Sequence, residues 1–276
     1  LGCADHSAES PGSLGGFSVP VIIHSMRTSS FLRSLFLSLG LAHAALASAA
    51  SGLDWQRVGA FEIARTETTI AQFRRFTEAT GTVTQAERDG GGYVYEAGFV
   101  RKPGWTWQRP FGTASHADWP AVHVNYAEAQ AFCAWAGGRL PTDAEWVSAA
   151  YTEQRPSPPA PWVRGTTYRY PTGHTPEGAQ CLEDCGKDRS MPVGTRLWRG
   201  IGPALAGQTL AGVNGLHDMG ANAWEWVDEP VGQSAQKRTR GGSWWYGEGP
   251  MRADHLAMKD ASFSVVYIGF RCARSL

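Results

Sequence analysis

The sequence predicts an α+β domain with few regular elements and long ordered loops. Short segments with helix or strand patterning are separated by glycine and proline, and residues 83–120 and 152–215 show no sustained periodicity. Glycine contributes 33 of the 276 residues, well above the ~7% usual for soluble domains. All 12 tryptophans lie at or after Trp55. We therefore expect a loop-rich domain after that point, with a core that rests on buried aromatic side chains.

Each expected element has a local signal. Residues 61–64, with the sequence FEIA, alternate as a strand does. Thr69, Asn125 and Thr142 are each followed three residues later by Gln or Glu, which is the spacing of a capping box at the start of a helix. Glycines after the first two helices mark where they end. The expected helices run from 70 to 80, from 126 to 135 and from 143 to about 151.

The charge composition argues against two classes of partner. Lys and Arg total 25, and Asp and Glu also total 25, so the formal net charge is zero. Proteins that bind nucleic acid or an anionic membrane surface do so through an excess of basic side chains. The sequence therefore gives no reason to expect either partner.

Residues 26–49 have the pattern of a secretory signal peptide. Met26 is followed by a basic segment and an apolar run that ends in Ala-Ser-Ala. A membrane anchor is the weaker alternative, because the run is shorter than the ~20 residues of a spanning helix. The chain begins with Leu1, so we expect residues 1–25 to be an upstream extension from a mis-set start.

Cleavage after Ala49 would leave residues 50–276 as one domain, which is long enough for one well-buried core and short for two. We expect this domain to be periplasmic or secreted, monomeric and without a membrane span.

Three groups of segments carry a resemblance to a known family. They are 120–126 (PAVHVNY) with 133–146 (CAWAGGRLPTDAEW), 214–218 (NGLHD) with 222–226 (NAWEW), and 240–244 (RGGSW) with 268–272 (IGFRC). In this order the segments resemble the formylglycine-generating enzyme family, also called sulfatase-modifying factors. Weaker similarity at 67–69 and 84–88 extends the resemblance over essentially all of residues 50–276. It implies a single formylglycine-generating-enzyme-like, C-type-lectin-related domain.

Two carboxylates lie in a glycine-containing loop flanked by aromatic residues. Asp218 and Glu225 could bind a hard cation together with backbone carbonyls, or could be satisfied by backbone amides or an arginine. The resemblance favours the first alternative. It implies a structural calcium ion held by the side chains of Asp218 and Glu225 and by the backbone oxygens of Ala221 and Ala223.

Four cysteines follow the expected cleavage site, and the sequence alone leaves three pairings open. The resemblance implies a disulfide between Cys133 and Cys272. Cys181 and Cys185 are then expected to form a local disulfide. Metal binding is the minority alternative for them, because this spacing supplies only two ligands.

The main departure from the family concerns its redox chemistry. Formylglycine-generating enzymes resemble this chain through Gly-Gly-Ser and then carry two cysteines five residues apart, which bind Cu(I) and activate oxygen to oxidise a substrate cysteine. Those positions hold Tyr246 and Met251 here. Neither side chain forms the thiolate that Cu(I) and thiol exchange require. We therefore do not expect formylglycine synthesis.

Several side chains near this position remain candidates for a catalytic cleft. Trp224 and Ser243 match residues that line the cleft of the family. The candidate catalytic residues are Trp224, Ser243, Tyr246, Arg252, Asp254 and His255.

Two functions are open for this cleft. One is an oxidative maturation enzyme that uses iron or copper in another arrangement, although the histidines show no ligand spacing and an adjacent Asp-His pair on a loop is more typical of a surface feature. The other is a non-catalytic periplasmic accessory or binding protein, because Trp, Tyr and Arg are typical of recognition sites. In either case the partner is expected to be a protein, peptide or small-molecule substrate.

Overall fold

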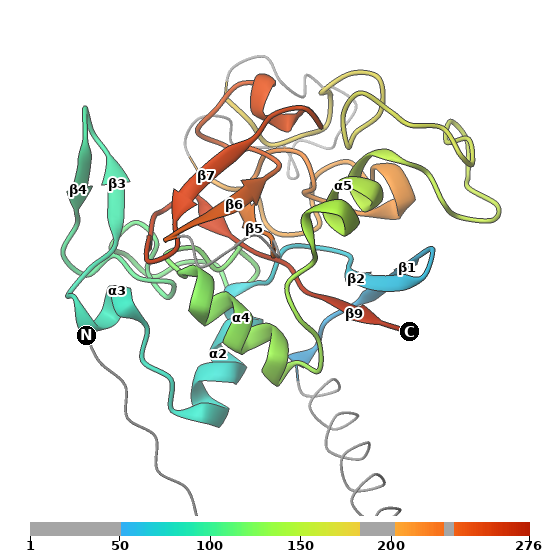
Figure 1. The fold of residues 1–276 in the computed structure, drawn as a ribbon. Helices are drawn as coiled ribbons and strands as arrows, with labels where there is room; N and C mark the ends of the chain where they lie inside the picture. The colour runs from blue at the N-terminus through green and yellow to red at the C-terminus, as the bar shows by residue number, and fades with distance from the viewer. Residues whose placement is uncertain (1–50, 183–201, 229–234) are drawn as a thin grey trace, which may run out of the picture. The chain divides into compact units, whose positions relative to one another are not determined.

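The computed structural model describes residues 51–182, 202–228 and 235–276, and its regular elements are short (Figure 1). The helices are α2 (Ile70–Thr80), α3 (Gln85–Arg88), α4 (Tyr126–Trp135) and α5 (Asp143–Tyr151). The strands are β1 (Trp55–Val58), β2 (Phe61–Ala64), β3 (Tyr93–Tyr95), β4 (Phe99–Arg101), β5 (Trp224–Trp226), β6 (Gln236–Arg240), β7 (Ala257–Asp260), β8 (Ile268–Gly269) and β9 (Ala273–Ser275).

The three expected helices begin where their capping boxes predict. Thr69, Asn125 and Thr142 each accept a hydrogen bond from the backbone three residues later, and the reciprocal bond is also present. α2 ends at Gly81, whose φ of 71° is left-handed. A fourth capping box, at Thr84, opens α3. It lies in the stretch where no element was expected.

The strands form three separate sheets. The strand orders are β1-β2-β9, β3-β4 and β7-β6-β5-β8. β8 runs parallel to β5, and β9 pairs antiparallel with β2. The segment that contains β8 and β9 therefore joins the four-stranded sheet to the three-stranded one. Figure 1 shows the β3-β4 hairpin projecting to one side.

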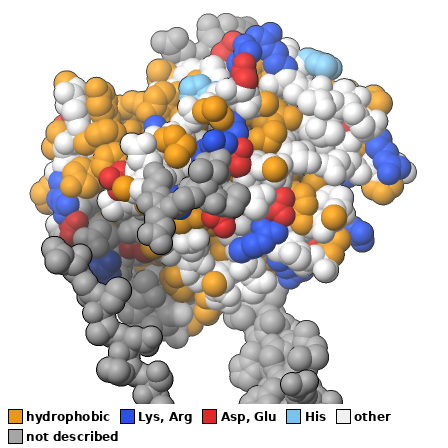
Figure 2. Space-filling model, in the orientation of Figure 1, with side chains coloured by type: hydrophobic (Ala, Val, Ile, Leu, Met, Phe, Trp, Pro, Cys, Tyr) orange, Lys and Arg blue, Asp and Glu red, His pale blue; other side chains and the backbone are white. Residues whose placement is uncertain are grey.

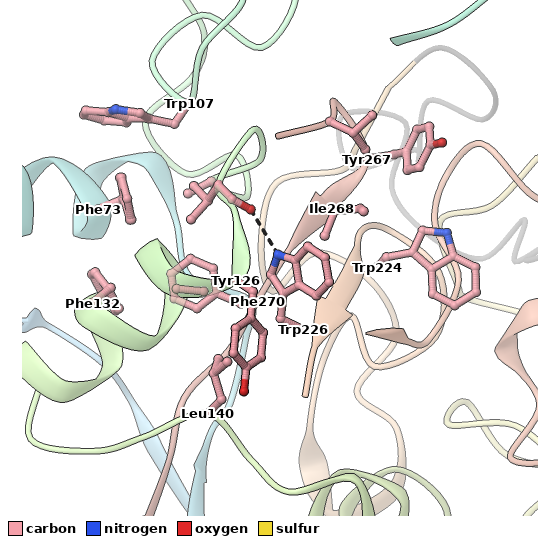
Figure 3. Close-up of a cluster of buried hydrophobic side chains, with 14 of the residues drawn as sticks. Phe73, Trp107, Tyr126, Phe132, Leu140, Trp224, Trp226, Tyr267, Ile268 and Phe270 are labelled. Carbon is pink, nitrogen blue, oxygen red and sulfur yellow. Dashed lines mark hydrogen bonds between the residues drawn. The ribbon is translucent and has the colours of Figure 1, made fainter. Parts of the chain in front are cut away.

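The core is aromatic, as the tryptophan distribution predicts. Phe132 packs between Phe73 and Phe270, with ring centroids 5.8 and 5.3 Å away. The Trp226 indole nitrogen donates a hydrogen bond to the Val124 carbonyl at 3.0 Å (Figure 3). The buried indole thus has its one polar atom satisfied within the core.

The disulfide implied by the resemblance is present. Cys133 on α4 is bonded to Cys272, just before β9. Cys181 is also disulfide-bonded, which leaves it no free thiolate for a metal. Cys185, its expected partner, lies outside the described residues.

Both expected N-terminal segments, 1–25 and 26–49, lie outside the described residues as well. Within the described ranges, no helix is both long and apolar enough to cross a bilayer.

The β3-β4 hairpin carries apolar side chains on its surface. Tyr95, Phe99 and Val100 are all exposed. Figure 2 shows hydrophobic side chains gathered over the hairpin at the upper left.

Candidate functional site

The loop that leads into β5 has an unusual backbone. Asn214, Asp218, Ala221 and Asn222 all have φ between 57° and 62°. This left-handed conformation costs a non-glycine residue roughly 1–2 kcal/mol. Four such residues so close together persist only where the surrounding contacts hold them.

Glu67, just before α2, holds one end of this loop. Its Oε2 accepts from Asn222 Nδ2 at 2.6 Å, and its Oε1 accepts from the Ala223 N–H at 2.8 Å. Asn222 Oδ1 in turn accepts from the Ala204 N–H at 2.8 Å. The loop is therefore fixed by a side chain that lies far away in the sequence.

Asp218 lies within the loop and is 2% exposed. Its Oδ1 accepts from the Thr209 hydroxyl at 2.6 Å, and its Oδ2 accepts from the Gly207 N–H at 2.7 Å. The Thr209 hydroxyl also accepts from the Asp218 N–H at 2.8 Å. Each oxygen of the carboxylate thus has one donor in these contacts.

Glu225, on β5, is fully buried against a guanidinium. Arg271 donates to its Oε1 and Oε2, both at 2.7 Å, and Trp146 donates to Oε2 at 2.7 Å. Arg271 also donates to the backbone carbonyls of Ala64, Arg65 and His217. The pair is a fork of charge-assisted hydrogen bonds in the interior of the domain.

The positive charge of the Arg271 guanidinium acts on three buried carboxyl groups, those of Glu67, Asp218 and Glu225. Burial raises the pKa of Glu67 well above its usual range, and the charges of Asp218 and Glu225 raise it further. Arg271 opposes these effects but carries a single charge. Three carboxyl groups are therefore buried near one guanidinium, and either a proton on Glu67 or a bound cation would offset their charge.

Asp218 and Glu225 thus have the partners of the alternative expectation, a backbone amide and an arginine, and their oxygens are also of the kind that the implied calcium site would use. Calcium takes oxygen ligands, and a carboxylate oxygen has lone pairs for two interactions. The side chains of Asp218 and Glu225 would hold it with the carbonyl oxygens of Ala221 and Ala223. Calcium binding itself remains a prediction.

A second group of candidates meets around Trp224, which Figure 3 labels at the side of the core away from Phe73 and Phe132. The rings of Tyr246 and His255 each lie 5.7 Å from the Trp224 ring. Trp224 itself is buried, whereas Tyr246 and His255 are partly exposed. We call these three residues the Trp224 surface.

The Trp224 surface has neighbours that shift proton affinities. Burial first, and then the charge of Lys259, lowers the pKa of His255. Burial and then interaction with the Tyr246 hydroxyl raise the pKa of Tyr267. The site therefore combines a neutral imidazole at pH 7 with the protonated phenol of Tyr267.

The other candidate residues, Arg252, Asp254 and Ser243, do not belong to the Trp224 surface. Arg252 and Asp254 form an exposed ion pair with each other at 2.8 Å. Ser243 is fully buried, and its hydroxyl accepts from the Trp245 N–H at 3.3 Å. Met251 is fully buried in a small apolar cluster. Of the six candidates, three form the Trp224 surface.

The described residues do not fit the expected iron or copper alternatives. The Asp254 carboxylate of the adjacent Asp-His pair is engaged by Arg252. Over the described ranges, no three His, Cys, Asp or Glu side chains are grouped to hold a metal ion. A two-histidine, one-carboxylate iron site would need such a group. The implied calcium site is compatible with this finding, because half of its ligands are backbone carbonyls.

Several important side chains were not singled out from the sequence. Glu67 and Arg271 lie in segments that carry the family resemblance, so the resemblance could have identified them as candidate site residues. The sequence gives no such signal for Lys259 and Tyr267, because no local pattern shows that they approach Trp224 or Tyr246 in the fold.

Comparison with known proteins places the chain in a family. Residues 52–276 match the sulfatase-modifying factor enzyme 1-like domain. The chain is 29% identical over 265 residues to the formylglycine-generating enzyme of Thermomonospora curvata, covering 79% of this chain and 82% of that one. It is 32% identical over 184 residues to the hercynine oxygenase of Mycolicibacterium thermoresistibile, covering 63% of this chain and 36% of the relative.

A solved structure agrees. PvdO from Pseudomonas aeruginosa matches with a TM-score of 0.53 and 18% identity over 78% of this chain and 80% of that one. This likeness confirms the expected fold class. Because the domain match spans most of the sequence, the chain belongs to the sulfatase-modifying factor enzyme 1-like family.

Proposed function

We propose that the protein is an exported oxidative maturation enzyme of this family that does not make formylglycine. The observation that carries the proposal is the position of Tyr246. Its ring packs 5.7 Å from Trp224, where the resemblance places the first copper-binding cysteine. A phenol cannot supply the soft thiolate that Cu(I) binding requires.

The surroundings of Met251, at the second cysteine position, support the same conclusion. Its side chain is fully buried, and the Tyr151 hydroxyl donates to its backbone carbonyl at 2.7 Å. A thioether buried in this way contributes packing and is at most a weak ligand.

The Trp224 surface would bind the substrate. Tyr246 offers a partly exposed aromatic face beside the buried Trp224, and His255 is neutral at pH 7 because its pKa is lowered. A neutral, partly exposed imidazole can accept a proton from a bound substrate. Support for oxidation comes from the relatives, one of which is named an oxygenase.

A search for a chemical change tests this proposal. Periplasmic metabolites and peptides are incubated with the protein in air and examined by mass spectrometry for loss of two hydrogens or gain of one oxygen. We expect a product that is absent with Trp224→Leu and present with the surface variant Arg57→Met. Conversion of a cysteine-bearing sulfatase peptide to its aldehyde by the unaltered protein would contradict the proposal.

We also propose that calcium stabilises the loop around Asp218. The support is the excess of buried carboxylates over guanidinium. A ligand that binds only the folded state adds about 2.7 kcal/mol at a hundred times its Kd. Calcium should therefore raise the thermal midpoint of protein stripped with EGTA, and Asp218→Ala, which removes the oxygen ligand, should reduce that rise. An equal rise in both proteins would place the ion elsewhere.

Export is proposed from residues 26–49, and the Cys133–Cys272 disulfide supports it. Disulfides persist in oxidising compartments. N-terminal sequencing of the protein from a periplasmic fraction should begin at residue 50, and an intact leader on cytoplasmic protein would contradict the proposal.

A non-catalytic accessory role is the second candidate. One observation favours it. Among the described residues, no three His, Cys, Asp or Glu side chains lie close enough together to hold a redox metal. Elemental analysis of protein purified without chelator separates the two candidates. Calcium alone would favour the accessory role, whereas bound iron or copper would favour the enzyme.

A further inference from the structure

β6 and β7 place two lysines directly opposite each other. Lys237 pairs with Lys259 in the antiparallel register, and like charges at opposed positions destabilise a strand pair. The arginines that alternate with Lys237 on β6 have an acidic partner, because Arg238 and Arg240 reach Asp143 at 2.7 and 2.6 Å. Alternate residues point to opposite faces, so the lysines lie on the face away from Asp143.

Each lysine lies over an aromatic ring. Lys259 Nζ is 5.2 Å from the centroid of Trp224, and Lys237 Nζ is 5.1 Å from that of Tyr126. Lys259 is partly buried, and burial alone lowers its pKa. No carboxylate among the described residues therefore offsets the cost of holding this ammonium beside Trp224.

Protection of the sheet edge does not account for this position. β7 is the outer strand of its sheet, and edge lysines discourage pairing with other chains by projecting charge into solvent. Lys259 instead rests on the same ring that Tyr246 and His255 contact. The cation thus belongs to the Trp224 surface.

We propose that Lys259 binds a carboxylate of the substrate, while the partly exposed Tyr246 ring, which packs on the buried Trp224, contacts the adjoining apolar part. The inference rests on the proposed function, because it assumes that substrate binds at the Trp224 surface. Lys237, opposite Lys259, adds a second positive charge that attracts an anion to this face. The substrate class is therefore an acid with an apolar or aromatic group next to its carboxylate.

A carboxylate fits this site better than a phosphate does. Phosphate groups are recognised by arginine forks or by several donors together. The nearby arginines are already paired, Arg238 and Arg240 with Asp143 and Arg252 with Asp254. One ammonium on an aromatic ring matches a single negative charge.

Binding of simple probes tests the inference without any turnover. 3-Phenylpropionate, its neutral amide and phenyl phosphate are titrated against the protein and followed by ligand-detected NMR. We expect the carboxylate to bind most tightly, and Lys259→Met to weaken its binding at least tenfold. The binding should also weaken with added salt, because the contact is partly exposed.

Lys102→Met is the matched control. Lys102 forms an exposed ion pair with Glu96 next to the β3-β4 hairpin, so its removal should leave probe binding unchanged. Lys259→Arg keeps the positive charge and should retain binding, so this variant separates loss of charge from loss of fold. Circular dichroism checks that each variant is folded.

Two outcomes would overturn the inference. One is equal carboxylate binding by the wild type and Lys259→Met, and the other is tighter binding of phenyl phosphate than of phenylpropionate. Failure of the proposed oxidation would give a result distinct from these two outcomes. Probe binding would still depend on Lys259, while no oxidised product formed from any periplasmic compound.

Discussion

His123 is buried between two backbone carbonyls. Its Nδ1 lies 3.2 Å from the Ser264 oxygen, and its Nε2 lies 3.0 Å from the Pro110 oxygen. Burial lowers the pKa of His123 from 6.5 to about 4, although both carbonyls favour the protonated ring. Between pH 4 and 6.5 the unfolded chain therefore binds more protons than the folded one, and the free energy of unfolding increases with pH. We expect this group to remove about 3 kcal/mol of stability as the pH falls through that window.

Urea denaturation of the wild type and of His123→Asn at several pH values measures this effect. Asn does not titrate, and it tolerates the φ of 57° at this position better than most residues. The free energy of unfolding should depend more steeply on pH in the wild type, whatever the absolute stability of the variant. Parallel slopes would show that another group titrates in this range.

The ion pair of Glu225 and Arg271 gives a second prediction at this scale. Both side chains are 0% exposed, so Arg271→Met leaves a buried carboxylate without its partner. Such a change costs about 3–5 kcal/mol. Denaturation in the presence of EGTA measures the loss without a contribution from calcium.

The exposed pair of Arg252 and Asp254 is the control for that measurement. Exposed ion pairs contribute little because water and salt screen them. Arg252→Met should therefore leave the unfolding transition almost unchanged. Equal losses in the two variants would mean that burial does not set the strength of the buried pair.

At the scale of elements, hydrogen bonds from Asn214 stabilise the C-terminal end of α5. Its Nδ2 donates to the carbonyls of Ala149 and Thr152, both at 2.8 Å, and its Oδ1 accepts from the Gln154 N–H at 2.6 Å. Asn214→Asp replaces the donor with an oxygen that faces two carbonyls. We expect a loss of roughly 3 kcal/mol, because the buried groups lose their partners.

Asn125→Asp is the matched change at a helix end that needs only an acceptor. Asn125 Oδ1 accepts from the Glu128 N–H at 3.0 Å at the start of α4. Asp is as good an N-cap as Asn, so stability should change little. Thermal unfolding of both variants makes the comparison, and a similar loss in each would contradict the donor role of Asn214.

The helices were predictable because their signals are local. Thr69 and Gln72 are three residues apart, so the capping box that they form can be recognised in the sequence without knowledge of the fold. The strands of two to five residues are too short for a period to show, apart from β2. Their partners are distant, as in the pairing of Glu225 with Gly269.

The candidate site was predictable to the same extent. Trp224, Tyr246 and His255 were found because the first two match or follow family motifs and the third lies close behind. Glu67 meets Asn222 across 155 residues, and Lys259 reaches Trp224 only because β7, β6 and β5 are neighbours. Contacts of this kind depend on the completed fold, so no local pattern reports them.

For the whole molecule, the disulfide between Cys133 and Cys272 is a covalent link between distant parts of the sequence. It joins residues 139 apart in sequence. Restricting so long a loop in the unfolded chain stabilises a domain by about 2–5 kcal/mol. The double variant Cys133→Ala, Cys272→Ala should lose that amount in urea denaturation. Because this variant keeps the disulfide at Cys181, it isolates the contribution of the Cys133–Cys272 bond, and an unchanged transition would contradict the prediction.

The segment 268–275 has a consequence for how the protein is made. It supplies β8 beside β5, Arg271 against Glu225, and β9 on β2. While this segment is still inside the ribosome, two of the three sheets lack a strand and the buried carboxylate lacks its partner. The domain therefore completes its folding only after segment 268–275 has been synthesised and has paired with β5 and β2.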